Sequence, residues 1–330
     1  MSAGSKLRKI TKWVLFTLLC LFFGFFYGVV PWFLTRAMTT GGFHFPDPND
    51  KKTPKDFGMD FQAVEFHSGD GILLKGWYVP ATVPGGEAKG TIVYLHGLNR
   101  TRVEMLPDAE FGHRIGYNGL LFDLRHQGES QGKITTIGYQ ERLDAEGAVH
   151  YALNNQKSKR PIIVWGVSMG AAAALMAAAE SPDISAVISD STFLNYEELI
   201  LHHYNLFLGI IRRRWWWFPP LPAFPLAYEV LYWSAWRGHF SPSDFDLEKA
   251  VREINPRPIL FIAVGGDLRM PPEYAQTLFG DATSAQKKLV VLGGTRHGEG
   301  FRSATKQYEE TVSQFLSTLP GGGQVASSGQ

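Results

Sequence analysis

Residues 166–170 read Gly166-Val167-Ser168-Met169-Gly170, a G-x-S-x-G pattern. An apolar run, Pro161 to Trp165, precedes it, and an alanine-rich stretch, Ala171 to Ala179, follows it. This order predicts a strand, a sharp turn and a helix. Glycines on both sides of Ser168 would let the backbone turn tightly enough to hold the serine hydroxyl above the edge of a sheet. Ser168 is therefore the candidate nucleophile, and the alternative is a chance match at the start of a helix.

Two downstream segments offer partners for Ser168. A serine hydroxyl becomes an effective nucleophile when a histidine removes its proton and a carboxylate fixes that histidine. The segment 257–264, predicted as a buried strand, leads to Asp267, which places a carboxylate at the end of that strand. The run 288–292 leads into a glycine-rich loop that carries His297. We predict Asp267 as the acid and His297 as the base, with Asp190 as a reserve acid.

The order Ser, Asp, His is the order found in the α/β-hydrolase superfamily. From about Phe61 to Leu319 the chain resembles the serine-hydrolase branch of that superfamily. Its segment Thr91–Leu98 is similar to the family's strand-HG-x segment, in which the residue after the glycine donates a backbone N–H to an oxyanion. The resemblance implies that Leu98 has this role and that Met169 supplies the second N–H of the oxyanion hole.

Further polar residues accompany these motifs. The segment Asp123–Ser130 is similar to the family's D-x-R-G-x-G-x-S loop. His126 stands where glycine is usual, so the resemblance does not determine the shape of this loop. Each of these residue types also has an ordinary structural use. We expect Asp123 and Arg125 to form an ion pair at a strand end, and His96 to pack and hydrogen-bond rather than react.

The resemblance implies an α/β-hydrolase fold, with a mostly parallel eight-stranded sheet flanked by helices. Segments 61–67 and 72–79 are expected to form an antiparallel hairpin, and the later strands are expected near residues 91, 119, 161, 184, 258 and 288. The interval of about 195–251 is too long for an ordinary connection between two strands. We predict that it is a cap inserted over Ser168.

The predicted cap has an unusual composition. Arg212-Arg213-Arg214 is followed directly by Trp215-Trp216-Trp217, and five of the nine tryptophans fall in the cap. One interpretation is a surface that enters a bilayer, with arginines at lipid phosphates and tryptophans at the interface. The other is that the aromatic side chains pack the cap against the core.

An apolar segment near the N-terminus predicts a membrane anchor. Trp13 to Leu34 contains no charged residue over 22 positions, a length of about 33 Å as a helix and enough to span a bilayer. Residues 1–12 carry four basic residues, which predicts a cytoplasmic N-terminus and an extracytoplasmic hydrolase domain. A cleaved signal peptide is the alternative, although no A-x-A site is evident. Residues 35–60 are predicted as a linker, 61–319 as the hydrolase domain and 320–330 as a disordered tail.

These features predict a membrane-anchored serine hydrolase that cleaves an ester or thioester of an apolar, lipid-like acyl group. A peptidase or amidase on the same fold, acyl transfer to another acceptor, and a non-catalytic membrane-tethered binding protein are the alternatives. We expect no metal and no organic cofactor. A net charge of +1 argues against a nucleic-acid partner. The single cysteine, Cys20, cannot form an intramolecular disulfide, and the sequence does not indicate an oligomeric state.

Overall fold

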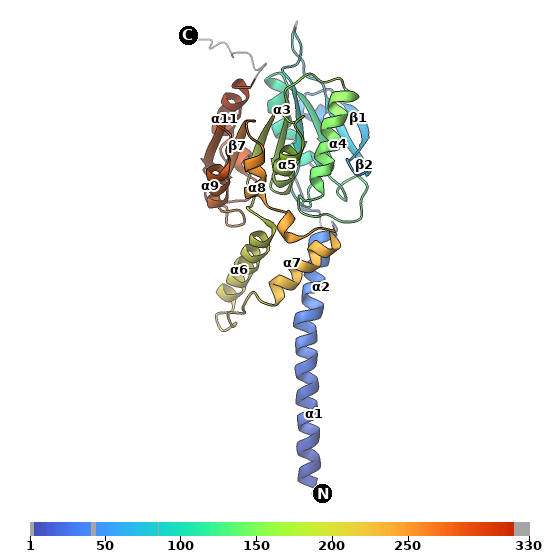
Figure 1. Cartoon of the computed structure of the whole chain (residues 1–330), viewed down its shortest axis with the longest axis vertical. Helices are drawn as coiled ribbons and strands as arrows, with labels where there is room; N and C mark the ends of the chain where they lie inside the picture. Colours follow the sequence, from blue (N-terminus) through green and yellow to red (C-terminus); the bar gives the residue numbers. More distant parts are fainter. Residues whose placement is uncertain (1–2, 41–43, 85, 320–330) are drawn as a thin grey trace.

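An eight-stranded sheet runs through the centre of the folded domain in the computed structural model (Figure 1). The structure describes residues 3–40, 44–84 and 86–319, so the tail predicted at 320–330 lies outside the described residues. The strands lie in the order β1-β2-β4-β3-β5-β6-β7-β8. Their bounds are β1 Gln62–His67, β2 Leu73–Val79, β3 Thr91–Leu95, β4 Asn118–Phe122, β5 Ile162–Val167, β6 Ala186–Asp190, β7 Ile259–Val264 and β8 Lys287–Leu292.

Most of this sheet is parallel. β1 and β2 form an antiparallel hairpin whose pairing ends at His67 and Leu73, and β2 is also antiparallel to β4. All pairings from β4 through β3 and on to β8 are parallel. β3, β5, β6 and β7 are buried along their whole length, as expected for aliphatic strands covered on both faces. The predicted eight-stranded α/β-hydrolase sheet is therefore confirmed.

Helices cover both faces of the sheet. One face packs against α4 (Glu141–Asn154), α5 (Met169–Glu180), α8 (Leu247–Glu253) and α9 (Pro272–Asp281). The other packs against α3 (Leu106–Arg114) and α11 (Thr305–Ser317), with the short α10 (Gly300–Ser303) leading into α11. α5 is buried from Met169 to Ala178. Its alanines let the helix backbone approach the sheet closely, which fixes the position of the residue just before it.

A long helical segment projects from the domain at the N-terminus (Figure 1). It consists of α1 (Ala3–Gly24), a π-helical turn η1 (Phe25–Val29) and α2 (Val30–Thr39). Over Lys6–Thr39 it is 34 residues long, with a mean hydropathy of 2.3 in its most apolar window, and none of that window is buried. It is long and apolar enough to cross a membrane.

The end of this helix is attached to the domain. The carbonyl of Thr39 accepts a hydrogen bond from the amide of Thr135, at 2.9 Å. The following segment also lies against the domain, since the Phe45 amide donates to the Asn99 carbonyl and Met59 is part of the core. The predicted linker 35–60 is thus helical to Thr39 and packed against the domain further on.

The cap consists of a pair of helices. α6 (Tyr196–Arg214) and α7 (Leu226–Arg237) are followed by a short turn, η4 (Pro242–Asp244). A β-bridge between Asn195 and Asp246 joins the two ends of this inserted segment. α8 falls inside the interval predicted as cap, but it packs against α5 and so belongs to the helical layer of the sheet.

Candidate active site

Ser168 lies on a sharp turn between β5 and α5. Its φ of 57° and ψ of −116° are rare for a residue with a side chain. The backbone is held there because the Ser168 amide donates to the Asp190 carbonyl and the Ser168 carbonyl accepts from the Ala172 amide. Such strain is typical of a nucleophile elbow, which presents the serine side chain at the C-terminal edge of a sheet.

The glycines around Ser168 are required by close backbone contacts. A Cβ on Gly166 would lie 2.2 Å from the carbonyl carbon of Gly170, and a Cβ on Gly170 would lie 2.2 Å from the carbonyl oxygen of Leu95. No side chain can occupy either position without moving the backbone. The G-x-S-x-G pattern is therefore a packing requirement of this turn.

The structure brings Ser168, His297 and Asp267 together. Nε2 of His297 lies 2.8 Å from Oγ of Ser168, and Nδ1 lies 2.7 Å from Oδ2 of Asp267. An ionised carboxylate can only accept, so Nδ1 carries the proton and Nε2 is free to accept from the serine hydroxyl. Asp267 and Ser168 are buried, and the His297 side chain is only 10% exposed. The arrangement can transfer a proton from Ser168 to His297.

Asp267 is held as an ionised acceptor. Its Oδ1 accepts from the amides of Arg269 and Met270, at 2.8 and 3.1 Å. Burial raises the pKa of Asp267, but the hydrogen bond and positive charge of His297, together with these two amides, outweigh burial and leave the pKa below its ordinary value. The carboxylate is thus negative when His297 takes up a proton.

Asp190, the reserve acid, has other partners. Its Oδ1 accepts from the Ser191 hydroxyl at 2.7 Å, and its Oδ2 accepts from the Tyr308 hydroxyl at 2.8 Å. Burial raises the pKa of Asp190, and these two hydroxyls oppose that effect. The histidine ring hydrogen-bonds to Asp267 and not to Asp190.

The loop after β3 passes directly beside the serine. A Cβ on Gly97 would lie 3.6 Å from Cβ of Ser168, so the next residue, Leu98, is near the nucleophile. Among the hydrogen bonds of residues 3–40, 44–84 and 86–319, none is donated by the amide of Leu98 or of Met169. Met169 is the first residue of α5, where backbone N–H groups have no partner in the helix. Both amides are available to a ligand atom.

Glu104 is a residue that the sequence did not indicate. Its Oε2 accepts from the Gly97 amide at 2.6 Å, and Oε1 lies 3.4 Å from Nε of Arg100. It therefore holds the turn that carries Leu98. It follows Gly97 by seven residues in a segment without a recognisable motif, so only the folded chain reveals this contact.

His96 packs and hydrogen-bonds as expected, whereas the predicted ion pair between Asp123 and Arg125 is wrong. His96 is buried, with Nδ1 donating to the Gly97 carbonyl and Nε2 accepting from the Leu124 amide. Arg125 is also buried, but it pairs with Asp144 and Asp70 rather than with Asp123. The strand ends at Phe122, so the side chains that follow no longer share one face of the sheet. Asp123 instead accepts from the amide of Arg102.

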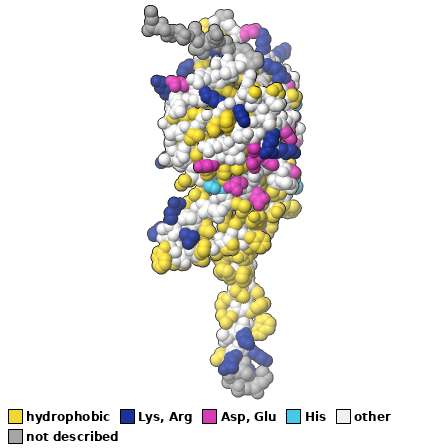
Figure 2. Space-filling view, turned by 60° about the vertical axis from the view of Figure 1, so that its left-hand side comes forward, with side chains coloured by type: hydrophobic (Ala, Val, Ile, Leu, Met, Phe, Trp, Pro, Cys, Tyr) yellow, Lys and Arg dark blue, Asp and Glu magenta, His cyan; other side chains and the backbone are white. Residues whose placement is uncertain are grey.

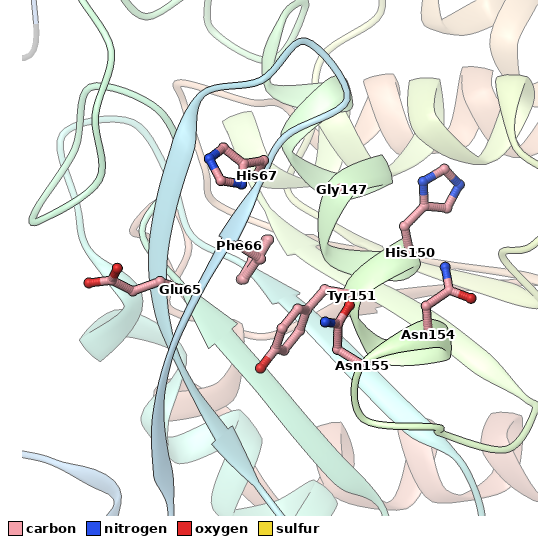
Figure 3. Close-up of a pocket in the computed structure, with 8 residues that line it drawn as sticks. All are labelled: Glu65, Phe66, His67, Gly147, His150, Tyr151, Asn154 and Asn155. Carbon is pink, nitrogen blue, oxygen red and sulfur yellow. The ribbon is translucent and has the colours of Figure 1, made fainter.

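Two surface hollows lie away from these side chains. One, of about 260 Å³, is bordered by β1 and α4, and Figure 3 shows His67, Tyr151 and His150 around it. The other, of about 840 Å³, lies between the loop after β4 and the C-terminal end of α7. Within the described part of the chain, no group of three or more His, Cys, Asp or Glu side chains is placed to hold a metal ion.

The cap extends from the acid loop to the base of the N-terminal helix. Near its beginning, His202 donates from Nε2 to the carbonyl of Leu268, the residue after Asp267. At its tip, Trp215, Trp216 and Trp217 are 49%, 86% and 67% exposed. Figure 2 shows hydrophobic side chains continuing from the helix onto the base of the domain, with basic side chains on the neighbouring projection. These three tryptophans are thus not packed into the core.

Comparisons with known proteins agree with the fold. The family model described as serine aminopeptidase, S33, matches residues 86–225. Protein bem46 of Schizosaccharomyces pombe is 26% identical over 80% of this chain and 79% of its own length. A polyketide transferase of Aspergillus fumigatus is 32% identical over 42% of this chain and 48% of its own. Among solved structures, an esterase of Pyrococcus furiosus has a TM-score of 0.65 and 26% identity, covering 84% of this chain and 98% of the esterase.

Proposed function

Because this chain belongs to the α/β-hydrolase superfamily, we propose that it is a membrane-anchored serine hydrolase that cleaves an ester or thioester of an apolar acyl group. The observation that carries the proposal is the continuous hydrogen-bonded series from Ser168 through His297 to Asp267. The similarity to the Pyrococcus furiosus esterase over most of both chains supports ester cleavage.

The proposed mechanism proceeds through an acyl-enzyme. Oγ of Ser168 attacks the carbonyl carbon of the substrate while Nε2 of His297 takes the hydroxyl proton. The amides of Leu98 and Met169 donate to the resulting oxyanion. His297 then gives its proton to the leaving alcohol or thiol as the bond to it breaks. A water molecule then attacks the acyl-enzyme while His297 takes its proton, and His297 returns that proton to Oγ of Ser168 as the bond to the acyl group breaks and the acid leaves.

A peptidase or amidase is the second candidate, and the description of the matching family model favours it. Chain-length series of p-nitrophenyl esters and a panel of aminoacyl p-nitroanilides separate the two. Turnover of esters that improves with acyl length, without turnover of the anilides, supports the ester proposal. Preferential cleavage of the anilides would instead assign the peptidase.

We further propose that Trp13–Leu34 is a retained anchor with its N-terminus in the cytoplasm. The helix that continues to Thr39 without burial of its apolar window supports this proposal. A signal sequence would be removed. Carbonate extraction of membranes and N-terminal sequencing of the mature protein distinguish the two, and protease protection of sealed vesicles reports the side on which the domain lies.

We also propose that the tip of the α6–α7 pair lies in the outer leaflet of the bilayer. Two observations support this: the tryptophans at the tip are exposed, and α7 packs against α2, whose buried face includes Pro31 within the predicted span. Figure 1 shows the pair reaching down alongside the N-terminal helix. The arginines that end α6 can extend their head groups to the phosphates. Quenching of Trp216 fluorescence by brominated lipid tests the proposal, with Trp216→Phe as the matched control.

The first experiment for the catalytic proposal is labelling by a fluorophosphonate probe. The probe reacts with an activated serine whatever the natural substrate is. We expect the purified full-length protein to be labelled and Ser168→Ala to remain unlabelled while its thermal unfolding is unchanged. A folded wild-type protein that is not labelled in detergent or in lipid would contradict the serine-hydrolase proposal and favour the non-catalytic alternative.

A further inference from the structure

The hollow of about 840 Å³ beside α7 has a basic lining. Lys133, Arg237 and His239 border it, and none of its lining residues is an aspartate or glutamate. Arg125 also borders it, but Asp144 and Asp70 already balance the charge of that guanidinium. The volume lies in the range of small-molecule sites, about 300–1,000 Å³. The hollow can therefore take an anionic group of substantial size.

The three basic side chains are without acidic partners. In the part of the chain that the structure describes, neither Lys133 nor Arg237 lies within 4.0 Å of a carboxylate oxygen, and His239 has no such neighbour either. Arg237 makes one hydrogen bond, from Nε to Oγ1 of Thr39 at 3.1 Å, which leaves the rest of its guanidinium fork for a ligand. A guanidinium fork matches the oxygens of a phosphate.

The position of the hollow relative to the N-terminal helix indicates the source of the phosphate. Arg237 bonds to Thr39, the last residue of α2, and the amide of Thr135, next to Ile134 of the lining, donates to the Thr39 carbonyl. Thr39 is five residues beyond the end of the predicted span, about 7.5 Å along a helix. The headgroup layer on each side of a bilayer is about 5–7 Å thick. In the anchored arrangement that we propose, Thr39 and the hollow beside it therefore lie at the outer edge of the headgroup layer, next to the lipid phosphates.

The remaining lining suits an amphiphile. Trp236 is 76% exposed and borders the hollow next to Arg237, while Ile72 and Ile134 add apolar walls. A tryptophan beside basic residues is typical of the membrane interface, where an aromatic ring meets the acyl boundary and the cations meet the headgroups. Inorganic phosphate has no apolar part that could contact these walls.

From this geometry we infer that the hollow is a binding site for the phosphate headgroup of an anionic glycerophospholipid in the outer leaflet. The inference rests on the proposed membrane anchoring, and it is separate from the catalytic proposal because none of the proposed catalytic residues borders the hollow. Lys133 and Arg237 would contact the phosphate, and Trp236 would cover the glycerol and the start of the acyl chains.

The test uses full-length protein in mild detergent and soluble dihexanoyl lipids, with binding measured by native mass spectrometry. The probes are dihexanoyl phosphatidylglycerol, dihexanoyl phosphatidylcholine and inorganic phosphate. We expect phosphatidylglycerol to bind best, and the double variant Lys133→Gln/Arg237→Gln to weaken its binding by about tenfold or more. The control Lys159→Gln/Arg160→Gln removes the same charge from the exposed segment just before β5, which the proposals leave away from the membrane, and should change the affinity by less than about twofold.

Several outcomes would overturn the inference. Equal weakening by the two double variants would mean that only overall charge is sensed. Phosphatidylcholine binding as tightly as phosphatidylglycerol would remove the anionic preference, and inorganic phosphate binding as tightly as the lipid would assign the hollow to free phosphate. Fluorophosphonate labelling of both variants, expected at the wild-type level, and carbonate extraction report the catalytic and anchoring proposals independently of lipid binding.

Discussion

Replacing Asp267 by asparagine changes the charge of the acid while its shape is conserved, and the surrounding hydrogen bonds determine how the new side chain is oriented. Oδ1 of Asp267 accepts from the amides of Arg269 and Met270, and Oδ2 faces Nδ1 of His297 at 2.7 Å. Asparagine has one oxygen. If its NH2 group faced the two amides, buried N–H donors would face each other without an acceptor, at a cost of about 1–3 kcal/mol for each unpaired group. The oxygen therefore stays at the amides and the NH2 faces His297.

This orientation forces the wrong tautomer on His297. An NH2 group facing Nδ1 requires Nδ1 to accept, so the ring proton moves to Nε2. Nε2 then donates to Oγ of Ser168, 2.8 Å away, and cannot remove its proton. We expect kcat to fall about ten-thousand-fold, a loss of about 5.5 kcal/mol of transition-state stabilisation, as in other triads that lose the correct tautomer. KM should change little, because Asp267 is buried behind the histidine.

The assay is steady-state hydrolysis of a p-nitrophenyl ester in detergent, with thermal unfolding recorded for each variant. Asp190→Asn is the matched control, since Asp190 is also a buried strand-end aspartate but bonds to Ser191 and Tyr308. It should keep kcat within about tenfold of wild type. Retention of activity by a folded Asp267→Asn protein, with loss in Asp190→Asn, would assign the acid to Asp190. Retention in both would refute the triad.

Three further predictions concern stability. Gly166→Ala should lower the free energy of unfolding by about 4 kcal/mol or more, because its Cβ would lie 2.2 Å from backbone atoms. Gly280→Ala in α9, where the Cβ would meet open space, should raise the free energy of unfolding by about 0.5–1 kcal/mol. Urea titration measures both changes, and equal effects would contradict the packing argument. Burial lowers the pKa of His96 below 6.5, so below that pH the unfolded chain binds a proton that the folded chain does not. The free energy of unfolding should therefore fall as the pH drops below 6.5, by at most about 1.4 kcal/mol per pH unit. The slope of the free energy of unfolding against pH should be smaller in His96→Gln, and an unchanged slope would show that other groups cause it. Arg125→Lys should cost about 3 kcal/mol, because lysine cannot reproduce the paired bonds to buried Asp144, and a loss below about 1 kcal/mol in thermal unfolding would contradict this.

The sheet and the proximity of the triad side chains could be predicted because their signals are local. Buried parallel strands are continuous aliphatic runs, and the C-terminal ends of parallel strands meet at one edge of a sheet. Ser168 follows β5, Asp267 follows β7 and His297 follows β8, so the order of motifs along the chain was enough to bring the three together. Their catalytic roles remain predictions until they are measured.

Contacts between distant segments could not be predicted in the same way. Arg125 pairs with Asp144 on α4, and Glu104 bonds to the turn at Gly97, because the fold places them there and not because of any spacing. The boundary between the cap and the helical layer of the sheet could not be predicted either. Asn195 caps α6 by accepting from the Glu198 amide, a recognisable signal, but only packing against α5 separates α8 from the cap.

The attachment of the N-terminal helix at Thr39 determines how far the domain lies from the membrane surface in the anchored arrangement that we propose. Thr39 is hydrogen-bonded to Thr135 and Arg237, and Phe45 is bonded to Asn99, so no slack tether separates helix and domain. Thr135 and Asn99 follow strands β4 and β3, at the same edge of the sheet from which Ser168 projects. In the anchored arrangement that we propose, Ser168 is therefore held close to one leaflet and moves with it in two dimensions. Molecules resident in that leaflet would meet the enzyme far more often than dissolved ones, so depth in the bilayer becomes a criterion of substrate selection.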